Sequence, residues 1–231
     1  MGQRRYEPMM SAERAERLRL WQERVYLGSR RTQTLTSEQL GLTVVVPPDV
    51  YPPNPNGLAE VVLKEVRTDD RVLDMGTGSG INALAAATKS SQVVAVDINP
   101  SSVLCARDNA ARNGVSDRIS VLESDLFAHV RGPFDLIMFD PPFRWFPPRD
   151  MVERATTDEN YATLTAFFDQ ARRFLSARGR ILLTFGTTGD LDYLHLLIQQ
   201  NHLTAEELRR REFVKDDLPV AYLTYRVQPV R

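Results

Sequence analysis

The sequence predicts an α/β fold in which a doubly wound, mostly parallel, seven-stranded sheet carries helices on both faces. From residue 71 onward, strand-length apolar runs alternate with helix-length segments, which is typical of strand–helix–strand units. The runs at 93–96 and 136–139 are apolar without alternation, as expected of strands buried on both faces. With 231 residues, of which 42% are hydrophobic, the chain can form one domain with its own core.

Residues 1–40 are expected to form an N-terminal helical extension and residues 41–231 the main domain. Ser11 can cap a helix that runs to about Leu27, because apolar side chains recur there at helical spacing, and Gly28 would end it. The extension could be a lid over a pocket, a contact between subunits, or a basic arm on nucleic acid, since residues 1–35 carry eight arginines and four glutamates. A polar connector at 30–36, a strand at 42–46, a proline-rich loop at 47–56 and a helix at 58–66 should follow.

The main domain should alternate strands and helices. Strands are expected at 72–75, 92–97, 118–123, 134–140, 179–185, 206–213 and 220–227, and helices at 81–89, 101–113, 161–177 and 191–200. In such a sheet, ligands bind beyond the carboxyl ends of the strands, near the point where the strand order reverses. The residues that directly follow strands are therefore the candidates for a functional site.

The composition argues against several classes of protein. One cysteine, Cys105, can form neither an internal disulfide nor a multi-cysteine zinc site, and no cluster of His, Cys and carboxylates suggests another metal, so no metal is expected. No apolar run has the ~18–20 residues of a membrane helix and no secretory leader is recognisable, so a cytoplasmic protein without membrane contact is expected. The net charge of −1 gives no global basic field for nucleic acid. Monomer and homodimer both remain open.

A glycine-rich loop follows the first strand of the main domain, in the order Asp74-Met75-Gly76-Thr77-Gly78-Ser79-Gly80. Glycines let the backbone turn tightly and approach a ligand. Ile81 stands where a dinucleotide fingerprint has its third glycine, and the absence of a phosphate-binding lysine excludes a P-loop. Asp97, at the end of the second strand, could accept both hydroxyls of a ribose, and Asp125, after the third, could accept from an adenine amino group. Alternatively, both carboxylates only cap helices.

The fourth strand ends in Asp140-Pro141-Pro142-Phe143, the most specific feature of the chain. Two successive prolines cannot continue a central strand and fix an extended turn. The Asp140 carboxylate and the Pro141 carbonyl could accept two hydrogen bonds from an –NH2 group and aim its lone pair at an electrophile, while Phe143 covers the planar group. Candidate substrate contacts are Pro142, Arg144, Trp145 and Phe146, although the last three could instead pack the loop onto the sheet.

These motifs resemble those of class I S-adenosylmethionine-dependent methyltransferases, which have a Rossmann-like fold. The resemblance implies S-adenosylmethionine as cofactor and S-adenosylhomocysteine as product. In that family the glycine loop passes under the methionine part, the acid after the second strand holds the ribose, and the acid after the third contacts adenine. The cofactor-binding residues implied here are Tyr51, Asn56, Asp74, Gly76, Thr77, Gly78, Gly80, Asp97, Ile98, Asp125, Leu126 and Asp140.

Over residues 42–227 the chain is most similar to the HemK/PrmC type, which methylates a glutamine side-chain amide. The similarity includes Val50-Tyr51-Pro52-Pro53 and Asp97-Ile98-Asn99-Pro100 besides the glycine loop and the double-proline turn. The glutamine enzymes have Asn-Pro-Pro-Tyr where this chain has Asp140 and Phe143. The Asp-Pro-Pro form is common in nucleobase amino-methyltransferases, so the acceptor stays open.

The resemblance implies N-methyl transfer with Asp140, Pro141 and Phe143 as catalytic residues. The favoured acceptor is an amine, guanidine or amide nitrogen of a small molecule or a protein side chain. A nucleobase amino group in RNA or DNA is the less favoured alternative, because residues after 35 are acidic overall and contain no recognisable RNA-binding module. A cofactor-binding module without catalysis is a third hypothesis, against which the intact Asp140–Phe143 motif argues.

Overall fold

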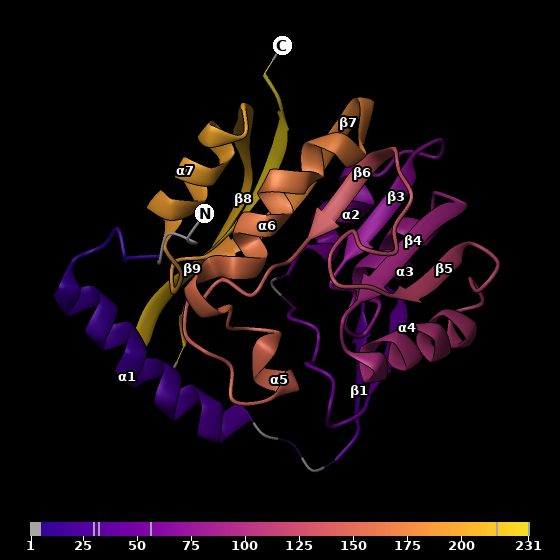
Figure 1. Cartoon of the computed structure of the whole chain (residues 1–231). Helices are drawn as coiled ribbons and strands as arrows, with labels where there is room; N and C mark the ends of the chain where they lie inside the picture. The colour runs from indigo at the N-terminus through magenta and orange to yellow at the C-terminus, as the bar shows by residue number, and fades with distance from the viewer. Residues whose placement is uncertain (1–5, 30, 32, 56, 216, 231) are drawn as a thin grey trace.

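The computed structural model describes residues 6–29, 31, 33–55, 57–215 and 217–230, and for residues 27–29 the backbone alone (Figure 1). Within these residues the main sheet has seven strands in the order β5-β4-β3-β6-β7-β9-β8. Neighbours from β5 to β7 are parallel, and β7–β9 and β9–β8 are antiparallel. The strands are β3 Arg71–Met75, β4 Gln92–Asp97, β5 Ile119–Glu123, β6 Phe134–Phe139, β7 Leu175–Gly186, β8 Leu203–Lys215 and β9 Leu218–Pro229. The predicted mostly parallel, seven-stranded sheet is confirmed.

Helices cover both faces of this sheet, because alternate residues of the central strands point to opposite sides. Leu136 and Met138 of β6 belong to one hydrophobic cluster, and Ile137 and Phe139 to the other. The helices are α2 Ala59–Glu65, α3 Ile81–Ala87 and α4 Pro100–Arg112 on the first side, and α6 Ala162–Ala171 and α7 Leu191–Gln200 on the second. The strand order reverses at β3, so the carboxyl ends of β3, β4 and β6 form the edge where a ligand is expected.

The N-terminal part consists of helix α1, Ala12–Ser29, and an antiparallel ribbon of β1, Leu35–Gln39, and β2, Leu42–Val46. The predicted helix is confirmed. The prediction of a polar connector is wrong for residues 35–36, because these residues begin β1. The strand has no apolar run of its own and exists because β2 pairs with it. Leu40 and Gly41 make the turn with φ of 57° and 75°, which suits a tight hairpin.

The other side of β2 is bonded to side chains of α4 and of the residue that directly follows it. Asn109 accepts from the Val45 N–H at 2.9 Å and donates to the Val45 carbonyl at 3.1 Å. Asn113 does the same with Thr43, at 3.1 and 2.7 Å. Asn109 also donates to the Ser79 carbonyl in the glycine loop, at 2.9 Å. The ribbon, α4 and the loop are thereby fixed to one another.

The helix predicted at 161–177 is too long. In the structure, α6 ends at Ala171, the 3-10 turn η2 covers Arg172–Phe174, and β7 begins at Leu175. Asp135 of β6 accounts for the difference, because it accepts hydrogen bonds from Ser176 at 2.7 Å and Arg178 at 2.9 Å. Tertiary contacts therefore override helix propensity here. Two short elements were not predicted, the 3-10 turn η1 at Glu159–Tyr161 and helix α5 at Met151–Arg154.

No helix in the described part of the chain has both the length and the apolar character needed to cross a membrane.

Candidate active site

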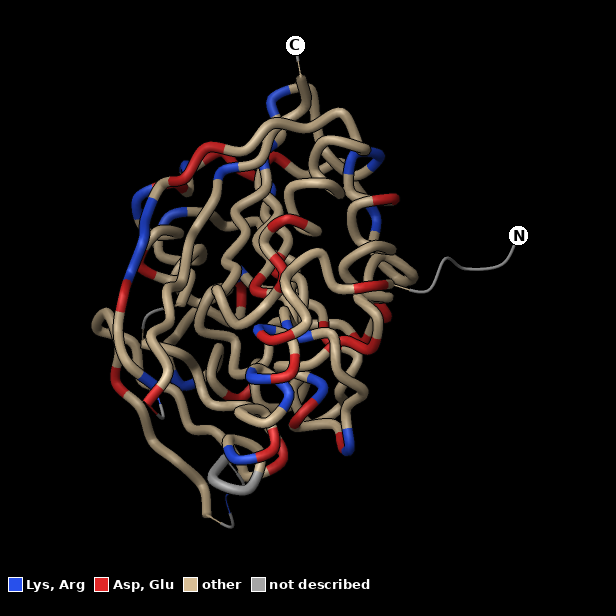
Figure 2. Tube along the Cα trace, turned by 90° about the vertical axis from the view of Figure 1, so that its left-hand side faces the viewer, with Lys and Arg blue, Asp and Glu red and all other residues tan. Residues whose placement is uncertain are grey.

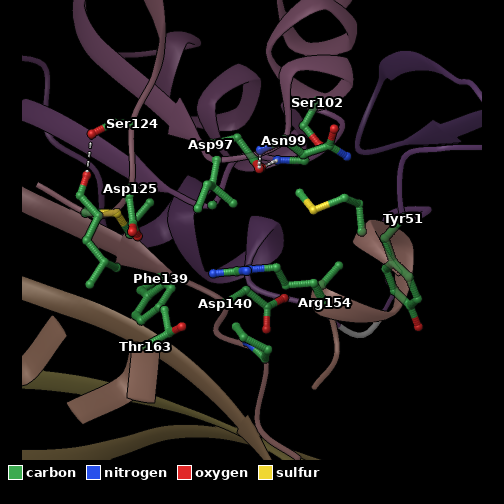
Figure 3. Close-up of a pocket in the computed structure, with 18 residues that line it drawn as sticks. Tyr51, Asp97, Asn99, Ser102, Ser124, Asp125, Phe139, Asp140, Arg154 and Thr163 are labelled. Atoms are coloured by element: carbon green, nitrogen blue, oxygen red, sulfur yellow. Dashed lines mark hydrogen bonds between the residues drawn. The ribbon is translucent and has the colours of Figure 1, made fainter. Parts of the chain in front are cut away.

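An open cavity of about 800 Å³ lies at the carboxyl ends of β3, β4 and β6 (Figure 3). The predicted site residues that line it are Tyr51, Gly76, Gly78, Asp97, Ile98, Asp125, Leu126, Asp140 and Pro142. The fold thus brings the loop, the two acids and the double-proline turn around a single space.

Other predicted residues do not line this cavity. Asp74, Thr77 and Gly80 belong to the glycine-rich segment but are buried. Pro141 is buried, and Phe143, Trp145 and Phe146 are partly buried beyond the turn. Asn56 lies outside the described residues.

The glycine loop has a left-handed backbone at Gly76, Gly78 and Gly80, with φ of 69°, 54° and 86°. A Cβ on Gly78 would meet nothing within 4 Å, so that side of the loop is open to a ligand. A Cβ on Gly80 would lie 3.2 Å from both Cα and Cβ of Ala106 in α4. Gly78 therefore leaves room for a ligand, whereas Gly80 permits close packing of the loop on a helix.

Gly80→Ala is expected to destabilise the protein by about 2–3 kcal/mol, because it adds a close contact to the strain of positive φ. Gly114→Ala is the matched control, since Gly114 also has a positive φ, 69°, but open space around its Cβ position. That variant should lose only about 1 kcal/mol. Urea unfolding of both variants measures the difference, and equal losses would contradict the packing role of Gly80.

Asp74 holds the loop from below. Its Oδ2 accepts from the Thr77 hydroxyl at 2.6 Å and from the Ala83 N–H at 3.2 Å. Its Oδ1 is buried without a hydrogen-bond partner among the described residues. Burial raises the pKa of Asp74 to about 6. Asp74 thus places a buried, unsatisfied acceptor beneath the loop that borders the cavity.

Asp97 ties the end of β4 to the loop. Its carboxylate accepts from the Gly78 N–H at 2.8 Å and from the Asn99 N–H at 2.9 Å. Burial raises its pKa, while these backbone hydrogen bonds act in the opposite direction. The capping alternative is wrong for Asp97, because Asn99 caps α4 by accepting from the Ser101 N–H. Asp125 is exposed on the cavity wall, and no described helix starts directly after it.

Asp140 follows β6 and is partly buried at the cavity wall. No described residue donates a hydrogen bond to its carboxylate, which leaves both oxygens available to a ligand. Burial raises its pKa to about 7, repulsion from Asp74 adds to the rise, and attraction to Arg209 opposes it. Asp140 is therefore an unpaired acceptor that changes charge near neutral pH.

The residues after the double proline are held by packing. Arg144 is only 4% exposed, and its guanidinium donates to Gln22 at 2.6 Å and to the Thr156 carbonyl at 3.1 Å. Arg144 was predicted either to contact substrate or to pack the loop onto the sheet, and these contacts are those of a packed residue. The Phe143 ring lies beside Phe185 and Tyr222, with ring centroids 5.5 and 5.7 Å away.

Half of the cavity lining was not predicted. Helix α5 and the residue after it contribute Met151, Arg154 and Ala155, and Figure 3 shows the Arg154 side chain extending across the cavity. A four-residue helix between prolines and polar residues gives no periodic signal from which to predict it. The others are Met75, Asn99, Ser102, Ser124, Phe139 and Thr163. Asn99 and Ser124 adjoin predicted acids and could have been proposed from that position.

These acceptors suit a ligand with hydroxyl and amino groups and a positive charge, since the cavity presents the carboxylates of Asp97, Asp125 and Asp140 above the unsatisfied Asp74 oxygen. In the described part of the chain, no group of three or more His, Cys, Asp and Glu side chains could hold a metal ion.

The family model of the methyltransferase small domain matches residues 56–213. The chain belongs to this family. It is thereby an S-adenosylmethionine-dependent methyltransferase, and family membership implies S-adenosylmethionine as its cofactor.

Relatives of this methyltransferase small domain protein carry names of protein methyltransferases. A Methanocaldococcus jannaschii protein provisionally named a protein N5-glutamine methyltransferase is 41% identical over 105 residues, 45% of this chain and 52% of its own. The release factor glutamine methyltransferase of Deinococcus radiodurans is 39% identical over 110 residues, 46% of this chain and 37% of its own. The chain thus spans about half or less of the length of these relatives. The resemblance to the HemK/PrmC type is confirmed.

Solved structures support the fold. The tRNA m1G37 methyltransferase of M. jannaschii superposes with a TM-score of 0.63 at 21% identity, covering 86% of this chain and 57% of that one. A ribosomal protein L11 methylase from Lactobacillus delbrueckii gives a TM-score of 0.58 at 22% identity, covering 80% and 84%. At this identity the likeness concerns the fold alone.

Proposed function

We propose that this methyltransferase transfers a methyl group to an –NH2 nitrogen of a protein side chain, with the Asp140–Phe143 turn orienting the acceptor. The observation that carries the proposal is the Asp140 carboxylate, which lies on the same cavity as the glycine loop and Asp97 and accepts no hydrogen bond from the described residues. An acceptor nitrogen bound there would be next to the donor.

At the donor end of the cavity, residues of the chain would bind and orient S-adenosylmethionine. Gly76 and Gly78 leave the loop backbone open, and Asp97 keeps lone pairs for the two hydroxyls of a ribose. Asp125 would accept from an adenine amino group, with Ile98 and Leu126 lining the cavity beside it. Tyr51 closes the opposite wall (Figure 3). Bound S-adenosylmethionine supplies an electrophilic methyl group on a sulfonium.

At the acceptor end, the Asp140 carboxylate and the Pro141 carbonyl would accept the two N–H groups of the acceptor. That arrangement aims the nitrogen lone pair along the line of displacement, and positioning of this kind is a large part of the rate. Because Asp140 has a pKa of about 7, it can also take the proton that the nitrogen loses.

Protein acceptors are favoured over small molecules by the relatives' names, which specify release factors and ribosomal protein L11. Nucleic acid is disfavoured by the pairing of the arginine run on β8. Arg209 and Arg211 form ion pairs with Glu60 at 3.1 and 3.3 Å, and Arg210 pairs with Glu207 at 3.0 Å. Figure 2 shows basic and acidic residues interspersed along the chain. The three arginines at 209–211 lie in a strand that also carries three glutamates, Glu206, Glu207 and Glu212, so the run offers little net charge to phosphates.

The test is methyl-labelled S-adenosylmethionine added with the protein to host-cell extract that has been separated into macromolecules and small molecules. We expect label in the macromolecular fraction. Protease should release this label, and nuclease should not. Label released by nuclease would replace the proposal with the nucleobase alternative. Label confined to small molecules would contradict a protein acceptor, and donor binding without any label would favour a non-catalytic module.

The pH dependence of transfer should follow Asp140. Its folded-state pKa of about 7 lies above the ordinary 3.8, so protonation on going from pH 8 to pH 6 removes the carboxylate that accepts the acceptor's N–H groups. We expect kcat/KM to rise with pH, to reach half of its plateau near pH 7 and then to level off. Initial rates between pH 5.5 and 8.5 measure this. Asp140→Asn should lose that inflection, and if it does not, another group controls the rate.

A further inference from the structure

The N-terminal segment, residues 6–26, is bonded to the two residues that follow Pro142. This segment comprises the start of the described chain and most of α1, which runs beside α5 and the β8–β9 end of the sheet (Figure 1). One route reaches Phe143 through Asp190 and Tyr161, and a second reaches Arg144 directly.

The first route is a chain of buried hydrogen bonds. The Tyr6 hydroxyl donates to Asp190 Oδ2 at 2.5 Å, and the Met9 N–H donates to the same oxygen at 2.7 Å. The Asp190 N–H donates to the Tyr161 hydroxyl oxygen at 2.7 Å, and the Tyr161 hydroxyl donates to the Phe143 carbonyl at 2.8 Å. Asp190 and Tyr161 are 1% and 0% exposed, so water cannot replace these partners.

The Phe143 carbonyl is also confined by close packing. A Cβ on Gly189, next to Asp190, would lie 2.1 Å from that carbonyl oxygen. A Cβ on Gly186 would lie 2.7 Å from the Phe143 ring. The backbone of residues 186–190, which includes Asp190, thus packs closely against Phe143.

The second route uses Gln22 of α1. Its side-chain oxygen accepts from Arg144 at 2.6 Å, and its nitrogen donates to Glu153 of α5 at 2.8 Å. The Arg144 guanidinium also lies over the Trp21 ring, 5.4 Å from its centroid. A buried guanidinium needs such partners, because an unpaired buried charge is costly.

We propose that the N-terminal segment is a part of the acceptor site, and that Tyr6 and Gln22 are positioning residues for the Asp140–Phe143 turn. The proposal rests on the function proposed above for that turn. It differs from the three roles that the sequence left open for the extension, since none of them requires buried bonds to Asp190 and Arg144. An acceptor displaced by about 1 Å can lose 10²-fold in rate.

The test compares Tyr6→Phe with Tyr193→Phe. Tyr193 is a matched control because its ring lies beside those of Tyr6 and Tyr161, while its hydroxyl is hydrogen-bonded to Thr165 and not towards Phe143. We measure kcat and KM with methyl-labelled S-adenosylmethionine and the protein fraction of the extract, and the affinity for S-adenosylhomocysteine by calorimetry. Tyr6→Phe should lower kcat about tenfold with the affinity unchanged within twofold, and Tyr193→Phe should leave both within twofold.

Two further variants keep the test decisive. Gln22→Met removes the bond to Arg144 without touching Tyr6, and it should lower kcat to a similar extent. Tyr6→Phe combined with Tyr161→Phe should be no worse than Tyr161→Phe alone, since both substitutions break one route. Equal effects of Tyr6→Phe and Tyr193→Phe, or additive losses in the double variant, would overturn the proposal. If Asp140→Ala also kept full activity, the proposed function itself would fail.

Discussion

Asp140→Ala is expected to lower the rate of methyl transfer by about 10³-fold, because it removes both the acceptor of the substrate N–H groups and the group that takes the proton. The affinity for S-adenosylhomocysteine should change by less than about fivefold, since the loop and Asp97 stay in place. Transfer to the protein fraction and calorimetry measure the two effects. Retention of near-normal turnover would place the chemistry elsewhere in the cavity.

Asp140→Asn separates acceptor classes. An asparagine keeps one acceptor oxygen and adds an –NH2 donor, so it can still bind an amide, which offers both an N–H and a carbonyl. It cannot pair with a cationic amine or take its proton. If the acceptor is an amide, this variant should keep activity well above that of Asp140→Ala. If the acceptor is an amine or a guanidinium, both variants should be equally poor.

Asp97→Ala is expected to weaken S-adenosylhomocysteine binding by at least about 100-fold. Two charge-assisted hydrogen bonds to ribose hydroxyls, each contributing about 1.5–3 kcal/mol, would be lost. The loop would also lose its bond from the Gly78 N–H to Asp97. Calorimetry measures the affinity. A loss below about fivefold would contradict the ribose-binding role.

A matched pair of variants separates the two roles of Asp97, which are binding of the ribose and anchoring of the glycine loop. Asp97→Asn keeps an oxygen that can accept from the Gly78 N–H but lacks the charge, so it should fall between Asp97→Ala and the native protein. Asp125→Ala should cost less than Asp97→Ala, because Asp125 is exposed and its bond would compete with water. If Asp97→Ala and Asp97→Asn lost the same affinity for S-adenosylhomocysteine, the charge of Asp97 alone would account for its contribution to binding.

The main sheet could be predicted from the sequence because its central strands are buried on both faces and lie between helices. The runs 93–96 and 136–139 are apolar for that reason alone, independent of which strand pairs with which. β1 could not be predicted, since Leu35–Gln39 is a strand only through its pairing with β2. The end of α6 was placed too late because Asp135, distant in sequence, draws Ser176 and Arg178 into β7.

The residues of the site also divide into those that the local sequence predicts and those that depend on contacts between distant parts of the chain. Residues directly after strands, such as Asp97 and Asp140, could be proposed because the fold fixes where strands end. The wall built by Met151, Arg154 and Ala155 comes from a loop after β6, whose path depends on contacts with α1 such as Gln22–Glu153. Such contacts join residues more than a hundred positions apart, and no local pattern encodes them.

The two asparagines at the C-terminal end of α4, Asn109 and Asn113, affect how the molecule behaves in concentrated solution. An edge strand with free N–H and C=O groups can recruit another chain and start an aggregate. Asn109 and Asn113 take up the outward-facing groups of Val45 and Thr43, so their amides act as a third strand made of side chains. β2 therefore presents no open ladder at these positions. Replacing both asparagines by alanine would leave these groups without partners, and because Asn109 also donates to Ser79, the glycine loop would be loosened together with the ribbon.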